Sequence, residues 1–403
     1  MRISTSSMFA NSTAQLGTLQ SQMARTQQQL ATQHRMLSPA DDPIASARVL
    51  EVTQSQSINA QFATNRASAR SSLSQEEVAL TGVQDLIGDA QTLAVAANNG
   101  TNSASDRATM ANELAGRLDD LMGLANTSDG NGSYLFGGYK SNAAPFVQTN
   151  GGVTYQGDQG QVLLQVGSAR KVSLSDSGSS VFEGIATGNG AFVTAATTTP
   201  VPNSGSGVIS AGAVTDPSKL TGHRYQIDFS APAGVSSYTV TDLTSGSTVP
   251  PAPAVATQAY ISGAPINVDG MSFAVTGAPA AGDSFGVQPS SKQSLFTTLS
   301  DMIAALRAPA NTPAEKQALS ASLGKANVNL NAALDNVLTV RSSVGTRQKE
   351  LDTLDTAGLD TDVQYAATLS GLQDLDVVKA ISQFTQQQAT LEAAQKTFKT
   401  LSG

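Results

Sequence analysis

Apolar residues recur every seven positions near both ends of this 403-residue chain. A seven-residue repeat keeps one stripe of a helix facing a partner helix, which is typical of coiled coils. One such segment could equally be an amphipathic helix on a globular core. Two matched ends instead favour terminal helices that run side by side. The candidate assembly interface consists of Phe9, Leu16, Met23, Leu30, Val377, Phe384, Leu391 and Phe398, and Leu37 extends the amino-terminal stripe.

Two longer heptad segments lie inside these ends. The first follows the break Ser38-Pro39-Ala40-Asp41-Asp42-Pro43, where Asp42 is the expected N-cap and Pro43 the first helical residue. This helix is predicted to reach about Ala97, and Ser105 or Asp106 is expected to cap a shorter helix after it. The second segment ends near residues 357–360, where an interruption is expected. The candidate rod core consists of Leu73, Leu80, Ile87, Leu323, Leu330, Val337, Val344 and Leu351.

In the middle of the chain the spacing of apolar residues changes from the helical repeat to the alternation of strands. Asn150-Gly151 between alternating segments is a hairpin signal, and residues 166–289 carry short alternating runs rich in Gly, Ser and Thr. Pro250-Pro251-Ala252-Pro253 is expected to be a loop or an edge there, because proline cannot donate to a central strand ladder. The predicted fold class is α+β, with long antiparallel coiled-coil helices from both chain ends and a central β-rich inserted domain.

Three domains follow from these patterns. Residues 1–40 and 362–403 are predicted to form a terminal coiled-coil assembly domain. Residues 41–165 and 290–361 form a helical rod domain with a β-hairpin, and residues 166–289 form a β-rich outer domain. The apolar stripes on the thin terminal helices need a further partner, because two such helices bury little surface by themselves.

Composition argues against several partners and chemistries. The net charge of −8 offers no basic cluster for nucleic acid or for an anionic membrane. The chain has no cysteine and only two histidines, His34 and His223, so we expect no catalytic residue, metal site or cofactor. Asp129, Asn131 and Ser133 begin like a calcium loop, but Tyr134 replaces its glycine and Lys140 its glutamate.

The amino terminus lacks the apolar run of a cleavable signal peptide, so we expect any export to use an uncleaved, polar amino terminus.

Three segments carry a family resemblance: residues 38–48, the stretch Tyr134-Leu-Phe-Gly-Gly-Tyr-Lys140, and residues 374–388. They resemble the flagellin family of bacterial flagella, and most closely its hook-associated proteins of the hook-filament junction. Residues 277–285 also resemble a stretch seen in hook-associated proteins. Related chains continue for a few apolar residues beyond the position of Gly403, so we expect a shorter carboxyl end here.

The resemblance implies a structural, non-enzymatic subunit that self-associates in a helical lattice of the extracellular flagellum. It implies export by the flagellar type III apparatus with a cytoplasmic export chaperone, and a position linking hook-associated protein 1 to flagellin. The alternatives are flagellin itself or another hook-associated axial protein. A secreted enzyme or glycan-binding module in the β-rich domain is a further alternative, and it would need convergent carboxylates or an aromatic platform.

Overall fold

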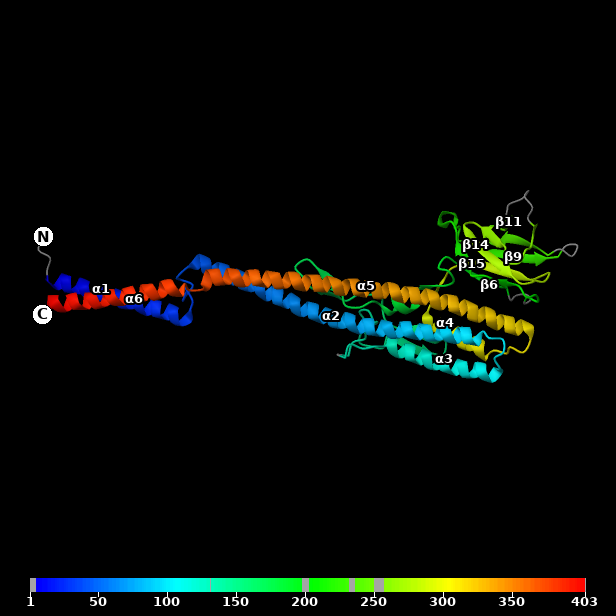
Figure 1. Ribbon diagram of the computed structural model, residues 1–403, viewed down its shortest axis with the longest axis horizontal. Coiled ribbons are helices and arrows are strands. Elements are labelled where there is room, and N and C mark those ends of the chain that lie inside the picture. The colour runs from blue at the N-terminus through cyan, green and yellow to red at the C-terminus, as the bar shows by residue number, and fades with distance from the viewer. Residues whose placement is uncertain (1–4, 131, 198–202, 232–235, 250–256, 403) are drawn as a thin grey trace. The chain divides into compact units, whose positions relative to one another are not determined.

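The computed structural model describes residues 5–130, 132–197, 203–231, 236–249 and 257–402. Long helices at both chain ends and a central antiparallel β-rich domain confirm the α+β class (Figure 1). Across the described residues, no helix is long and apolar enough to cross a bilayer. The stretch Pro250–Pro253 lies outside the described residues.

The described part of the chain contains six α-helices. They are α1 (Thr5–Thr32), α2 (Pro43–Ala97), α3 (Ala104–Ala125), α4 (Leu295–Arg307), α5 (Pro313–Gln373) and α6 (Val377–Ser402). The predicted extent of the long helix from Pro43 to Ala97 is confirmed. The expected interruption at residues 357–360 was wrong, because α5 continues to Gln373.

Two smaller expectations were also wrong. The helix α1 ends at Thr32, so Leu37 lies in the connection to α2. The cap of α3 is Ser103, whose side chain accepts the N–H of Asp106 at 3.2 Å while Asp106 accepts the N–H of Ser103 at 2.9 Å. This reciprocal capping box satisfies two free donors at the helix start, which is why the helix begins at Ala104.

The chain divides into two compact units, and the division falls within α2 and α5. The terminal unit holds residues 1–67, 165–170 and 351–403, and the central unit holds residues 68–164 and 171–350. In the terminal unit, α1 lies beside α6 (Figure 1). The three-domain division drawn from the sequence stays a prediction.

In the central unit, α3 packs against α4, and the hairpin of β1 (Phe146–Thr149) and β2 (Gly152–Tyr155) lies against α4. Asn150 and Gly151 form its turn, so the predicted hairpin is confirmed. Four phenylalanines and a tyrosine join these elements with ring centroids 5.0–5.9 Å apart. They are Phe136, Phe146, Phe182, Phe296 and Tyr155. Aromatic residues are only 5% of the chain, and gathering five of them here builds a core where helices and hairpin meet.

The remaining strands form small antiparallel sheets. The main one runs in the order β11 (Ser247–Val249), β10 (Ser237–Asp242), β9 (Tyr225–Ser230), β15 (Ser284–Pro289) and β6 (Phe192–Ala196), with β12 (Thr257–Ala259) also on β10. A second joins β13 (Pro265–Val268), β14 (Met271–Thr276) and β7 (Val208–Ile209), with β8 (Ala213–Val214) also on β14. Two further pairs are β3 (Leu163–Gln165) with β4 (Lys171–Ser173), and β5 (Ile185–Ala186) with β16 (Lys292–Gln293).

Alternation along the strands builds the core of this β-rich domain. In β9, Tyr225, Ile227 and Phe229 are buried while the residues between them are partly exposed. A period of two places one set of side chains on one face of the sheet, as the sequence predicted. The same part of the chain contains two short helical turns, a π-helical turn at Ser179–Glu183 and a 3-10 turn at Pro217–Lys219.

Candidate assembly surfaces

The helices α1 and α6 pack against each other through part of their apolar stripes. The rings of Phe9 and Phe398 lie 5.0 Å apart, and Leu391 is only 7% exposed. Leu16, Met23, Leu30, Phe384 and Phe398 are half-buried, whereas Phe9 and Val377 stay exposed. The structure therefore brings the predicted residues together within one chain and leaves part of the stripe uncovered.

Two exposed apolar side chains of α6 were not anticipated. Val378 is 81% exposed and Ile381 is 52% exposed, although both are large aliphatic residues. They lie outside the seven-residue series that begins at Val377. A count of all apolar positions on the helix, rather than of the best heptad, would have found them. Exposed apolar residues on a thin helix pair indicate a surface that another protein covers.

The two chain breaks of the terminal unit are joined through the backbone. The N–H of Arg35 donates to the carbonyl of Gln373 at 2.7 Å, and the N–H of Leu375 donates to the carbonyl of Gln33 at 2.9 Å. Gln33 has a φ of 58°, an unusual conformation for a residue with a side chain. We call these two breaks together the hinge pair. These hydrogen bonds hold the end of α1 next to the start of α6.

Carboxylates hold the amino-terminal break in shape. Asp42 accepts the N–H of Ala45 at 3.0 Å, next to Pro43 as the first residue of α2. Asp41 accepts the N–H groups of Leu37 and Ser38 at 2.9 and 3.1 Å, which lowers its pKa. Asp42 thus stabilises the start of α2, and Asp41 closes the loop that precedes it.

All eight candidate rod-core residues are buried within the chain. The structure places Leu73, Leu80, Ile87, Leu323, Leu330, Val337 and Val344 in the central unit and Leu351 in the terminal unit, each at most 2% exposed. The seven-residue spacing keeps them on the inner faces of α2 and α5.

Each unit also contains ion pairs, buried or partly buried, that the sequence did not reveal. In the terminal unit, Arg66 of α2 pairs with Asp355 of α5 and donates to the carbonyl of Val166 at 3.1 Å. In the central unit, Arg347 pairs with Asp176. Asp176 in turn donates its backbone N–H to the buried carboxyl of Glu76 at 2.9 Å. No local pattern marks these pairs, because their members are 100 or more positions apart in the chain.

The segment Tyr134–Lys140 forms a tight loop closed by Asp158. The carboxylate of Asp158 accepts the N–H of Tyr139 at 2.9 Å and that of Gly160 at 2.8 Å. Gly138 has a φ of 69°, and a side chain at this position would collide with Asp158. The paired glycines of this motif are therefore a requirement of the backbone, and the loop holds Tyr139 outward.

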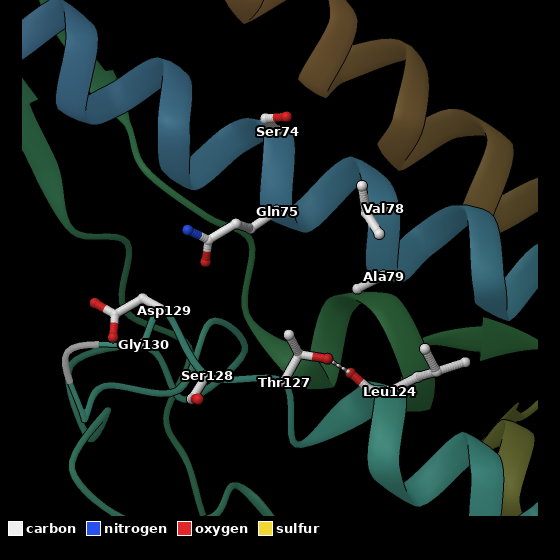
Figure 2. A pocket seen from close by; sticks show the side chains of 9 residues that line it. All are labelled: Ser74, Gln75, Val78, Ala79, Leu124, Thr127, Ser128, Asp129 and Gly130. Carbon is white, nitrogen blue, oxygen red and sulfur yellow. Dashed lines mark hydrogen bonds between the residues drawn. The ribbon is translucent and has the colours of Figure 1, made fainter.

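A shallow pocket of about 460 Å³ opens on the central unit between α2 and the end of α3 with the segment that follows it (Figure 2). Val78, Ala79 and Leu124 supply its apolar side, and Ser128 and Asp129 lie at its polar side (Figure 2). Asp129 belongs to a turn in which it accepts the N–H of Ser133 at 3.0 Å. Val78 is 70% exposed, so the apolar side of the pocket is open to solvent.

The carboxylates of the β-rich domain serve its loops. Asp283 is buried and accepts the N–H groups of Ser204, Gly205 and Ala280 at 2.7–3.0 Å. His223 lies 2.7 Å from Asp242, whereas His34 is exposed in the break after α1. Within the described ranges, no group of three or more His, Asp or Glu residues could hold a metal ion.

Comparisons with known proteins agree with this arrangement. Residues 3–141 match the family described as the bacterial flagellin N-terminal helical region. Residues 199–289 match the D2-like domain of flagellar hook-associated protein 1.

Whole-length relatives give a closer comparison. The chain is 31% identical over 404 residues to flagellar hook-associated protein 3 of Salmonella typhimurium, covering 100% of this chain and 98% of that protein. It is similar to the crystal structure of flagellar hook-associated protein 3 from Legionella pneumophila, with a TM-score of 0.76 and 32% identity over 80% of this chain and 98% of that one. Xanthomonas campestris FlgL gives a TM-score of 0.70 and 32% identity over 79% of this chain and 99% of that one.

Proposed function

The chain belongs to the family of flagellar hook-associated protein 3, and from that premise we propose that it is the adaptor that joins hook-associated protein 1 to flagellin. It is a structural subunit of the hook-filament junction and not an enzyme. Its place is the extracellular flagellum. We propose that it acts there by self-association in a helical lattice, with its terminal helices as the assembly surface.

One observation carries this assignment of the surface. After α1 and α6 have packed together, Val378 and Ile381 remain among the exposed large apolar side chains of the chain. A pair of helices alone has no third element to cover them. Neighbouring axial subunits supply that cover in a lattice, and burial of apolar area is the main source of free energy for such association.

The same surface needs protection before export. We propose that a cytoplasmic export chaperone covers the α6 segment and delivers the chain to the flagellar type III apparatus. The exposed apolar residues of α6 support this, because an uncovered strip of this kind promotes aggregation.

The test uses cells that lack the native gene. The unmodified chain should restore filaments. Ile381→Asp should be secreted and melt at the same temperature, yet leave bare hooks and shed flagellin into the medium, because it places a charge in the proposed interface. Gln386→Asp is the matched control, since Gln386 is an exposed polar residue of the same helix and the change adds the same charge.

Two results would count against the proposal. Normal filaments with Ile381→Asp would show that this face is not an assembly surface. Immunogold label along the whole filament, rather than over one short zone at its base, would favour the flagellin alternative over the junction role.

A further inference from the structure

Tyr139 is an exposed aromatic side chain on a loop that cannot easily move. It is 70% exposed, while its backbone N–H is held by Asp158 and its neighbour Gly138 has no room for a side chain. Its ring also lies against Gly160, where any side chain would strike the ring atoms. One part of the ring is therefore supported by the protein and the rest faces solvent. A side chain ordered in advance loses little freedom on binding, which is typical of a binding anchor.

The pocket beside Val78 has complementary properties on the same unit. It is lined by Val78, Ala79 and Leu124, with the acidic Asp129 at its polar side (Figure 2). The side chain of Leu124 packs against Gly82, where an added Cβ would lie only 3.0 Å from it. The glycine therefore allows Leu124 to lie close to the backbone of α2. The pocket is shallow, and its volume of about 460 Å³ leaves room for a phenol ring.

We propose that Tyr139 of one copy inserts into the Val78 pocket of the next copy in the junction. This inference rests on the proposed function, because it assumes that copies of this chain are neighbours. Lys140, exposed beside the tyrosine, brings a positive charge toward the Asp129 side of the pocket. In the helical lattice of the proposed function each copy offers its tyrosine to one neighbour and its pocket to another, so the contact is heterologous and continues from copy to copy.

The absence of cysteine from the chain gives a clean test. Val78→Cys and Tyr139→Cys are combined in one chain and expressed in cells that lack the native gene. Mild oxidation of isolated hook-filament complexes should then give disulfide-linked dimers and higher multimers that reducing agent collapses. Each single variant should stay monomeric. The matched control combines Tyr139→Cys with Val95→Cys, because Val95 is also a highly exposed valine of α2 but does not line the pocket.

Three outcomes overturn the inference. They are no multimers in complexes that carry filaments, equal multimers in the Val95→Cys control, and dimers of Tyr139→Cys alone, which would mean a symmetric contact. If the double variant does not assemble, cells making the two single variants together should yield linked dimers, and their absence overturns it as well.

A second measurement does not need cysteine. Tyr139→Phe should retain filaments, while Tyr139→Ala should shed about tenfold more flagellin, the effect of losing one binding anchor. Equal shedding by both variants overturns the inference. The proposed function stands in that case, provided that the unmodified chain restores filaments.

Discussion

Replacing Glu76 by glutamine should stabilise this protein at alkaline pH. The Glu76 side chain is completely buried in the central unit, and burial, reinforced by the nearby Asp176 carboxylate, raises its pKa to about 8. One carboxyl oxygen accepts the N–H of Asp176, and the other has no hydrogen-bond partner. At neutral pH the folded chain therefore holds a protonated acid here. Glutamine has nearly the same shape and cannot ionise, so it reproduces this state.

The sign of the effect follows from the two pKa values. In the unfolded chain the carboxyl loses its proton near its ordinary value of 4.5, whereas in the folded chain it keeps the proton until about pH 8. The stability that the neutral acid supplies is thus complete below pH 4.5 and is lost as the pH rises to 8. At about 1.36 kcal/mol per pKa unit, the rise from 4.5 to about 8 corresponds to a loss on the order of 5 kcal/mol. The Glu76→Gln variant should keep its free energy of unfolding over this pH range, because glutamine does not ionise.

Urea unfolding followed by circular dichroism at pH 4.5 and pH 8.5 measures the difference. The two proteins should have similar free energies of unfolding at pH 4.5, and the variant should be several kcal/mol more stable at pH 8.5. Glu77→Gln is the control, because the partly exposed Glu77 pairs with Arg341 at 2.6 Å and its loss should not stabilise the protein at either pH. Equal stability of Glu76→Gln and the unmodified protein at pH 8.5 would refute the reasoning.

Three further changes test packing. Val337→Asp should lower the free energy of unfolding by several kcal/mol in a urea titration, because it puts a charge in a fully buried site; an unchanged midpoint would contradict this. Asp283→Asn should cost roughly 1–3 kcal/mol, since an amide cannot accept all three backbone N–H groups. Proteolysis of loop residues near Ser204 should then accelerate, and an unaltered cleavage rate would argue against the clamp. Leu391→Asp should separate α1 from α6 and expose both to protease, and continued protection of α1 would show that this contact is dispensable.

Heptad counting predicted the helices well because their inner residues meet a partner at every second turn. It misplaced the carboxyl-terminal break because Gly358 looks like a helix terminator. In the structure a Cβ at Gly358 would lie 2.6 Å from the guanidinium of Arg66, and Asn59 donates to the Gly358 carbonyl at 2.8 Å. This glycine permits close approach of two helices within the terminal unit. That approach involves residues 299 positions away, so no local rule could reveal it.

The candidate surfaces were only partly predictable for a similar reason. A stripe such as Phe384 and Leu391 identifies an apolar face but not which copy or helix covers it. The structure shows that α1 covers much of this face, while Val378 and Ile381 stay uncovered. The Val78 pocket had no sequence signal at all, because its walls come from α2, from the end of α3 and from the segment after α3.

The hinge pair has a consequence for the order in which the chain folds. Its two hydrogen bonds join residues 33–35 to residues 373–375, and the helix that packs on α1 is α6, which begins at Val377. The helix α1 can therefore complete this packing only after α6 has been synthesised. Contacts this distant in sequence form slowly, because a very long loop must close first. Until then the apolar stripe of α1 lacks the helix that covers it in the folded chain.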